Sequence, residues 1–439
     1  MAEQMKPSGI DWIGNIPTSW KYSKVKFCFS LVNGSTPESG DYDCWDGDIK
    51  WITPADMSDT GTISQGERFI TKYGYDSCGT TLLPVGSIVI SSRAPIGKIN
   101  ITTAELCTNQ GCKSLIRNAD NRYFYYLFLA GQNELSLLGR GTTFLELSTY
   151  DLNEFGIVIP AEDEQKAIAD FLDKECAQID SIAADLERQI ALLQQYKKSL
   201  ITETVTKGLD KSVPMKDSGI EWIGKIPAHW NFKRLKFMLE NTAESMKVGP
   251  FGSALSGSDF TDEGKWVYNQ RVVLDNNFSE NTTFVSEEKF KEMRSFAVYP
   301  GDILITTRGT IGKVAIVPDG ANEGILHPCI IKFRVDKEMI MPELLRLIFD
   351  ESDFVKDQFA LMSNATTIDV IYSYSLKDIL LPVIPADEQK KIYGYLSKKC
   401  IAIDGIIAEK QKALATITQH KKSLIYEYVT GKKRVKEAR

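Results

Sequence analysis

Two short segments of this chain carry basic side chains at matching positions. One reads GSIVISSRAPIGK and contains Arg93 and Lys98, and the other reads GDILITTRGTIGK and contains Arg308 and Lys313. Alternating Ile and Val, then a glycine before a second apolar run, indicate a strand, a tight turn and another strand. A guanidinium and an ammonium beside such a turn could bind a phosphate, or they could pair with carboxylates of the protein while the glycines only make the turn.

Residues that could catalyse a reaction do not form a convincing group. The sequence has no GxxxxGK[ST] phosphate loop, no FxGxG-type cofactor loop and no [DN]PP[FY] signature. Its three histidines are scattered, and its eight cysteines include no CxxC pair. Asp275, Glu287 and Lys289 loosely follow a metal-nuclease pattern, but this pattern is common by chance in charged loops. We therefore predict a chain that is not an enzyme, with no catalytic residue and no metal site.

Composition narrows the class of protein further. A length of 439 residues with 43% hydrophobic content predicts two or three domains with real cores. The formal net charge is −6, and the two regions 21–150 and 231–380 hold 12 basic against 13 acidic and 17 against 22. Any nucleic-acid binding must then use positive groups gathered on one face, or a partner must contribute. No run is apolar enough for a membrane span or a signal peptide, so we expect a cytoplasmic protein with no membrane partner.

An internal repeat organises the chain. Residues 5–20 (MKPSGIDWIGNIPTSW) and 215–230 (MKDSGIEWIGKIPAHW), which we term the lead segments, are identical at eleven of sixteen positions. A later block, Glu164–Thr206, aligns without gaps to Glu388–Thr430 and is identical at nearly half of its positions. The inserts between these blocks look mostly unlike each other. A two-copy frame with two different inserts predicts two heads that present different recognition surfaces.

Two long helices follow the inserts. Each begins after a Pro-containing hinge, IVIP or VIP, with acidic residues in its first turn, which is typical of a helix N-terminus. The hinges differ by one residue, PAEDEQ against PADEQ, which puts exact symmetry of the halves in doubt. We expect helices from about 162 to 207 and from about 387 to 430, with Lys410 interrupting the second apolar stripe. The stripe residues, spaced as in a coiled coil, are Leu172, Ile179, Leu186, Leu193, Leu200, Leu396, Ile403, Ile417 and Leu424.

These helices need apolar partners. Two seams in one chain most simply pack on each other, and a pseudo-twofold relation requires them to run antiparallel; the alternative is that each helix packs on its own head. We predict a mixed α and β fold with two globular heads separated by two long antiparallel coiled-coil helices. The expected segments are 1–160, 161–210, 211–385 and 386–439, the last with a basic tail. Helices are also expected at Tyr123–Gly131 and Pro342–Phe349.

The whole layout resembles the specificity subunit of type I restriction–modification systems. The lead segments, the IP-A-[DE]-x-x-EQ hinges and the KKSLI-x-E-x-VT helix ends carry this resemblance. The first insert also resembles one recognition-domain lineage of that family through NGSTPE at residues 33–38, Trp45-Asp46-Gly47 and Trp51-Ile52-Thr53. The second insert resembles another lineage through VGPFGSAL at residues 248–255.

The resemblance implies a subunit without catalysis of its own. Two target-recognition domains would each read one half of an interrupted, asymmetric site in double-stranded DNA. The helices would set the spacer and dock two modification subunits, which are methyltransferases that bind S-adenosylmethionine. Restriction subunits, which use ATP and Mg²⁺ to translocate and cut DNA, would join the same core. This chain itself would bind no cofactor.

The repeat also sorts residues by role. Features shared by both heads cannot specify different bases, so they build the fold or hold phosphates, whereas features that differ are candidates for base readout. Trp45, Trp51, Phe251 and Trp266 are expected to be core residues or loop anchors. The phosphate candidates are Arg93, Lys98, Arg308, Lys313, Thr143 and Thr367, the two threonines having a turn or cap role as the alternative. The base-readout candidates are Ser35, Thr36, Lys50, Thr53, Lys247, Ser253, Asn269, Gln270 and Arg271.

A second hypothesis comes from another class of protein. A coiled-coil scaffold could bridge two protein partners without touching DNA, and the acidic net charge suits it slightly. The paired Arg and Lys hairpins and the resemblance favour DNA. The sequence does not give the target sequence, the spacer length, the methylated base or the presence of a restriction subunit.

Overall fold

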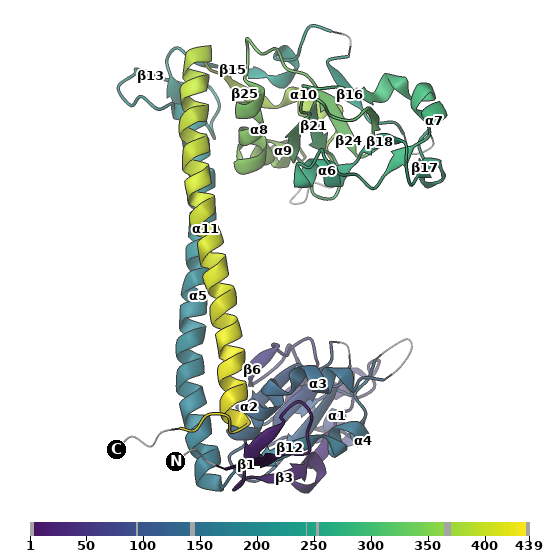
Figure 1. Cartoon of the computed structure of the whole chain (residues 1–439), viewed down its shortest axis with the longest axis vertical. Helices are drawn as coiled ribbons and strands as arrows, with labels where there is room; N and C mark the ends of the chain where they lie inside the picture. Colours follow the sequence, from purple (N-terminus) through teal and green to yellow (C-terminus); the bar gives the residue numbers. More distant parts are fainter. Residues whose placement is uncertain are drawn as a thin grey trace. The chain divides into compact units, whose positions relative to one another are not determined.

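The computed structural model describes residues 4–93, 95–140, 145–242, 244–251, 254–363 and 370–435, with only the backbone at 362 and 363. The chain divides into two compact units. Unit 1 holds Met1–Glu187 and Lys412–Arg439, and unit 2 holds Arg188–Gln411. Each unit therefore combines one insert with part of each long helix, and the helices themselves are labelled α5 and α11 in Figure 1.

Unit 1 contains several small sheets and short helices ahead of α5. Its helices are α1 (Lys72–Ser77), α2 (Arg122–Ala130), α3 (Gln132–Leu137) and α4 (Thr149–Glu154), with a 3-10 turn, η1, at Val25–Phe27. Its strands are β1 (Met5–Pro7), β2 (Asn15–Pro17), β3 (Lys21–Lys24), β4 (Ser30–Asn33), β5 (Trp45–Ile52), β6 (Thr60–Ile63), β7 (Arg68–Ile70), β8 (Ile88–Ser91), β9 (Ile99–Thr102), β10 (Cys107–Thr108), β11 (Cys112–Ile116) and β12 (Gly156–Ile159).

Unit 2 repeats the plan with a different periphery. Its short helices are α6 (Gln270–Asp275), α7 (Glu287–Glu292), α8 (Pro342–Glu351), α9 (Phe354–Ser363) and α10 (Ser373–Asp378), with a 3-10 turn, η3, at Leu235–Phe237. Its strands are β13 (Met215–Asp217), β14 (Lys225–Pro227), β15 (Asn231–Arg234), β16 (Met246–Val248), β17 (Phe260–Thr261), β18 (Lys265–Tyr268), β19 (Phe284–Val285), β20 (Ala297–Val298), β21 (Ile303–Thr306), β22 (Val314–Ile316), β23 (Gly324–Leu326), β24 (Ile330–Phe333) and β25 (Leu380–Val383).

Each unit has its own core sheet, and the two sheets have corresponding strand orders. In unit 1 the strand order is β4-β11-β8-β9 with β6 added in parallel, and in unit 2 the order is β16-β24-β21-β22. Both predicted hairpins are confirmed, because β8 pairs antiparallel with β9 and β21 with β22. Gly97 and Gly312 precede the second strand of each with φ of +94° and +77°, the left-handed region that favours glycine. The helices expected near 123–131 and 342–349 are also confirmed, as α2 and α8.

The long helices run antiparallel within each unit. Helix α5 spans Glu162–Lys207 and α11 spans Ala386–Val429, close to the expected bounds. In unit 1, Asp180 pairs with Lys421 at 2.6 Å; in unit 2, Lys197 pairs with Asp404 at 2.8 Å. Lys421 and Asp404 stand at the repeat positions of Lys197 and Asp180, so one cross-helix ion pair occurs twice.

The apolar stripe is buried most deeply where the helices meet the heads. Leu172 and Leu396 have no exposed surface, and Ile179, Ile403 and Leu424 are less than a tenth exposed. The remaining stripe residues, Leu186, Leu193, Leu200 and Ile417, are half-buried. The interpretation in which the helices pack on each other is confirmed, and each end also packs on a head.

The hinge difference does not break the repeat. Ile159 pairs with Lys21 and Val383 with Asn231, which are corresponding strand positions, and each is followed five residues later by a helix glutamate. The strand register is thus the same in both hinges, and the proline is displaced by one residue. The two glutamates, Glu164 and Glu388, accept hydrogen bonds of 3.1 Å from the indole N–H groups of Trp20 and Trp230, which are fully buried.

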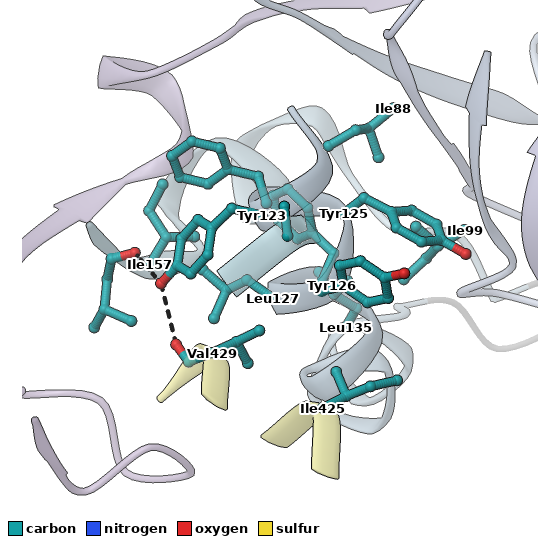
Figure 2. Packing of buried hydrophobic residues seen from close by; sticks show 14 of the residues in the cluster. Ile88, Ile99, Tyr123, Tyr125, Tyr126, Leu127, Leu135, Ile157, Ile425 and Val429 are labelled. Atoms are coloured by element: carbon teal, nitrogen blue, oxygen red, sulfur yellow. Dashed lines mark hydrogen bonds between the residues drawn. The ribbon is translucent and has the colours of Figure 1, made fainter. Parts of the chain in front are cut away.

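Each head is completed by the end of the helix from the other repeat. In unit 1 the core of α2 packs against Leu424, Ile425 and Val429 of α11, and Figure 2 shows Ile425 and Val429 facing the α2 side chains. The Tyr123 hydroxyl donates to the Val429 carbonyl at 3.1 Å, the bond drawn in Figure 2. In unit 2, Ile201 and Val205 of α5 have the corresponding place.

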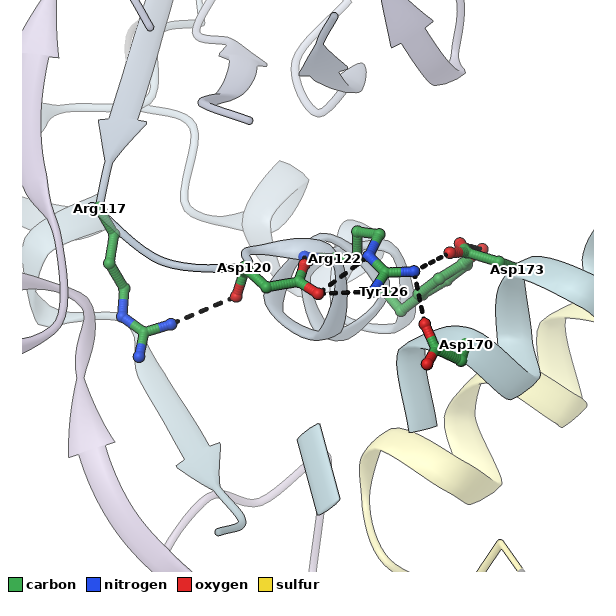
Figure 3. Close-up of polar contacts among 6 residues, drawn as sticks. All are labelled: Arg117, Asp120, Arg122, Tyr126, Asp170 and Asp173. Atoms are coloured by element: carbon green, nitrogen blue, oxygen red, sulfur yellow. Dashed lines mark hydrogen bonds and ion pairs between the residues drawn. The ribbon is translucent and has the colours of Figure 1, made fainter. Parts of the chain in front are cut away.

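A charged network also ties α2 to α5 in unit 1. Arg122 pairs with Asp120, Asp170 and Asp173 at 2.6–2.8 Å, and Tyr126 donates to Asp173 (Figure 3). The hydrogen bonds with these carboxylates raise the pKa of Arg122, and the bond with Asp120 contributes most. The contact between Arg122 and Asp120 also lowers the pKa of Asp120.

Among the described helices, none is long and apolar enough to cross a bilayer.

Candidate functional site

The hairpin of unit 1 has one of its two cations neutralised. The Arg93 guanidinium lies 3.4 Å from the Glu146 carboxylate, and both side chains are nearly half exposed. Their backbones also form an antiparallel bridge. Lys98 is half-buried and donates to the carbonyls of Pro54 and Met57 at 2.9 and 2.8 Å, so its ammonium holds a neighbouring loop. The alternative in which the arginine pairs with a carboxylate of the protein therefore holds for Arg93. Lys98 stabilises a neighbouring loop.

The hairpin of unit 2 differs at the same positions. Arg308 is exposed, and its bridge partner is Val370, so valine occupies the place that Glu146 has in unit 1. Within the described ranges, the Arg308 side chain has no ion pair. Lys313 donates to the Asp350 carbonyl at 3.1 Å. Of the four basic phosphate candidates, Arg308 is the one best placed to meet an anion.

A buried tryptophan anchors the polar loop of unit 1 that contains Ser35 and Thr36. The Trp51 indole donates to the Ser35 carbonyl at 3.0 Å, and the Thr36 hydroxyl bonds to Gln110. Ser35 and Thr36, both half-buried, therefore lie in a loop that is fixed against residues 108–111. Thr53 is different, because its N–H and its hydroxyl both bond to Asp56 at 2.7 and 2.8 Å, which closes a turn.

The sequence reasoning missed an arginine beside this loop. The Arg68 guanidinium lies 3.5 Å from the centre of the Trp45 ring and 5.7 Å from that of Trp51. Arg68 sits on β7, paired with β5, the strand that carries the predicted candidate Lys50. Stacking leaves the edge of the guanidinium free to donate, which suits bidentate recognition of an acceptor pair. No sequence signal identifies it, because the contact depends on the register of two strands.

In unit 2 the predicted readout residues do not act alike. Asn269 caps α6 by accepting from the Val272 N–H at 3.2 Å, and Gln270 donates to the Arg308 carbonyl at 2.9 Å. Both amides are thus occupied within the protein. The Arg271 side chain is 76% exposed, and its ion pair among the described residues is the i,i+4 pair with Asp275 at 3.4 Å, so it is the most accessible of the described candidates in this unit. Lys247 lies over the Phe296 ring at 4.9 Å.

The anchor prediction is mostly confirmed. Trp45, Trp51 and Trp266 are 3–7% exposed. Phe251 is 85% exposed, so its placement as a core residue or loop anchor was wrong. Thr143, Thr367 and Ser253 lie outside the described residues.

Two buried lysines have contrasting partners. Lys113 of β11 is 6% exposed and donates to Asn33 Oδ1 at 2.9 Å and Thr149 Oγ1 at 3.1 Å; burial lowers its pKa. Lys332 of β24 is 4% exposed and pairs at 3.2 Å with Asp302, which is 1% exposed. Unit 1 thus buries a cation among neutral oxygens, while unit 2 buries an ion pair.

The nuclease-like residues do not converge. Asp275 is on α6 and pairs with Arg271. Glu287 is on α7 and pairs with Lys265 of β18 and with Lys291 of its own helix. Over the described part of the chain, no group of three or more His, Cys, Asp or Glu side chains could hold a metal ion.

Each unit has a groove where its head meets the helices. The groove of unit 1 has a volume of about 810 Å³ and contains the Asp180–Lys421 pair. The groove of unit 2 has a volume of about 530 Å³ and contains the equivalent Lys197–Asp404 pair together with Lys313. Burial lowers the pKa of Lys197, but hydrogen bonds to Asp404 and Glu351 together outweigh it, so that the pKa is raised above its ordinary value.

Comparison with known proteins gives consistent results. A family described as "Type I restriction modification DNA specificity domain" matches residues 17–191 and 246–416. The MjaIX specificity subunit of Methanocaldococcus jannaschii is 33% identical over 52% of this chain and 53% of that protein. The putative MjaX specificity subunit of the same organism is 25% identical over 97% of this chain and 96% of its own length. A chain from a solved type I restriction–modification system, 13% identical, has the same fold, with a TM-score of 0.67 over 94% of this chain and 98% of that chain.

Proposed function

Because this chain belongs to the type I restriction modification DNA specificity domain family, we propose that it supplies the DNA specificity of a type I restriction–modification complex. Each unit reads one half of a bipartite, asymmetric site in double-stranded DNA. The observation that supports this most directly is a frame repeated in both units that carries different polar side chains at its surface. Ser35, Thr36 and Arg68 stand in unit 1, whereas Arg271 and Lys247 stand in unit 2.

The long helices fit a second task, the docking of modification subunits. Large apolar side chains remain exposed on them, including Ile182 and Ile406, which occupy the same repeat position and are 49% and 43% exposed. Leu192 and Ile401 are more exposed still, at 57% and 73%. Exposed apolar helix faces of this kind suit a partner helix.

In this proposal the chain is not an enzyme. The modification subunits bind S-adenosylmethionine and methylate the DNA, and restriction subunits, where present, use ATP and Mg²⁺. The chain itself holds no cofactor and works in the cytoplasm. Its net charge of −6 fits a reader whose phosphate contacts are shared with the partner subunits.

The test is a methylation map. Co-expression with the modification subunit, followed by genome-wide detection of modified bases by long-read sequencing, should show a bipartite motif with a fixed gap. A stable complex that leaves DNA unmodified would contradict the proposal. The comparisons give no support to the alternative of a scaffold without DNA binding, which would show no salt-dependent affinity for duplex DNA.

The helices should also set the gap. Deleting one heptad from Ile179–Gln194 shifts the cross-helix register by two turns, so we expect an altered spacer or complete loss of methylation. Methylation with an unchanged spacer would exclude the ruler role.

A further inference from the structure

One exposed patch occurs in both units at matching places. In unit 1 the patch is formed by Phe27 at the end of η1 and Tyr150 on α4, which are 74% and 72% exposed. In unit 2 it is formed by Phe237 at the end of η3 and Tyr374 on α10, which are 62% and 67% exposed. We call these four residues the paired aromatic patch.

The same backbone contact places each aromatic pair. In unit 1 the Val25 N–H bonds to the Phe155 carbonyl at 3.1 Å, joining η1 to the end of α4. In unit 2 the Leu235 N–H bonds to the Ile379 carbonyl at 2.8 Å, joining η3 to the end of α10. Val25 and Leu235 are fully buried below the patch. The frame therefore presents both aromatic pairs in one local geometry, although the inserts around them differ.

The charges beside the patch are also duplicated. Lys24 and Lys26 share the carboxylate of Glu154. In unit 2, Arg234 and Lys236 share the carboxylate of Asp378, at 3.4 and 2.9 Å. One lysine of each pair, Lys26 or Lys236, also lies over the patch phenylalanine, at 5.1 Å in unit 1 and 5.4 Å in unit 2.

These features fit a protein partner better than a DNA backbone. A surface that binds DNA phosphates presents cations that are free to pair with them. Here both cations of each unit already pair with a carboxylate of that unit. Large aromatic rings stay mostly exposed beside these ion pairs, although Tyr374 also stacks on Tyr372 at 5.4 Å. Such rings are the side chains that most often dominate protein–protein interfaces. Unit 1 has Ser148 at the repeat position of Tyr372, so the two patches are similar but not identical. Since all four patch residues recur at matching positions, the patch does not distinguish two half-sites, but it can bind two copies of one partner.

We propose that the paired aromatic patch is a docking surface for the two modification subunits, one on each unit, separate from the exposed faces of α5 and α11. The inference rests on the proposed function, because it takes its partner from there. Phe27 with Tyr150 anchors one copy, and Phe237 with Tyr374 anchors the other.

The experiment counts partner copies. Native mass spectrometry of the full chain with purified modification subunit would compare the wild type with the Phe27→Ala/Tyr150→Ala variant, the Phe237→Ala/Tyr374→Ala variant and a combined four-residue variant. We expect two bound copies in the wild type, one in each double variant and none in the combined variant, with each lost copy weakened at least about 30-fold in Kd.

Matched controls are single exposed residues outside the patch. Tyr73→Ala in unit 1 and Leu361→Ala in unit 2 remove side chains that are 59% and 61% exposed, and both variants should retain two copies. Circular dichroism and thermal melting verify folding, since all four patch residues are on the surface.

Two outcomes would overturn the inference while leaving the proposed function intact. One is two bound copies in the combined variant with unchanged Kd. The other is normal partner binding with a weakened, less salt-dependent affinity for DNA, which would make the patch a phosphate surface. If the wild type itself binds no modification subunit, the docking part of the proposed function fails as well, and the methylation map tests its DNA-reading part separately.

Discussion

Units 1 and 2 use one frame but distribute charge on it differently. Both bury a tryptophan whose indole bonds to a helix glutamate, and both pair two cations with one acid beside an exposed phenylalanine. At the hairpin, however, unit 1 places Glu146 against Arg93 where unit 2 places Val370 beside Arg308. The frame thus fixes where a side chain stands, while the inserts decide which charge reaches the surface.

The equivalence of the two units can be tested at the buried tryptophans, Trp20 and Trp230. Trp20→Ala and Trp230→Ala each remove a fully buried indole and the hydrogen bond that it donates to a helix glutamate, so each should destabilise its own unit by about 3–5 kcal/mol. Urea unfolding, with hydrogen-exchange mass spectrometry to separate the units, measures both. Trp→Phe variants retain most of the volume and should lose less. Clearly unequal losses would show that the frame is not equivalent in the two units.

The buried lysines sharpen the difference. Among the described residues, Lys332→Met leaves the buried Asp302 with Arg334 as its one cationic partner and should cost about 3 kcal/mol. Lys113→Met leaves only Asn33 and Thr149, which are within 3.1 Å of each other, and should cost below about 1 kcal/mol. The free energy of unfolding of the two variants gives the contrast directly. Equal losses would mean that Lys113 has an acidic partner after all.

The hairpin charges can be exchanged between the units. Glu146→Gln releases Arg93, so the assembled complex should bind duplex DNA a few-fold more tightly, with a steeper salt dependence by about one phosphate contact. Val370→Glu gives Arg308 a carboxylate and should have the opposite effect. Titrations at several salt concentrations measure both slopes. Unchanged slopes in both variants would place the hairpins away from the DNA backbone.

A further expected effect concerns pH. The hydrogen bond from Arg122 lowers the pKa of Asp120, so this contact stabilises the folded state above the ordinary aspartate pKa near 4 and is lost as the pH falls through the lowered value. Arg122→Gln should then cost about 1 kcal/mol at pH 7, a modest value because these groups are partly exposed. The difference from wild type should shrink below about pH 4. A difference that is constant with pH would assign the loss to packing instead.

The sequence predicted the frame well because its signals are local. Proline followed by acidic residues marks a helix start, and leucine at every seventh position fixes a stripe, so the bounds of α5 and α11 agree closely with expectation. The hairpins follow from alternating Ile and Val and from a glycine turn. These features depend on neighbours a few residues away.

The candidate site was predicted less well because its contacts are not local. Lys98 looked free for phosphate, yet it holds two carbonyls more than forty residues away. The stacking of Arg68 on Trp45 depends on strand register, and the capping role of Asn269 depends on where α6 begins. Sorting by repeat identified positions that face the surface, but not which of their atoms are already bonded within the protein.

The core of each head includes the end of the long helix from the other repeat, and this affects the order in which the heads can fold during synthesis. The core around Tyr123 needs Leu424 and Val429, which leave the ribosome after nearly all of the chain has been synthesised. At about 5–20 residues per second, the first head waits on the order of tens of seconds for its last packing partners. The second head has Ile201 and Val205 before its own insert appears, so it can fold first, in the reverse of the order in which the two heads are translated.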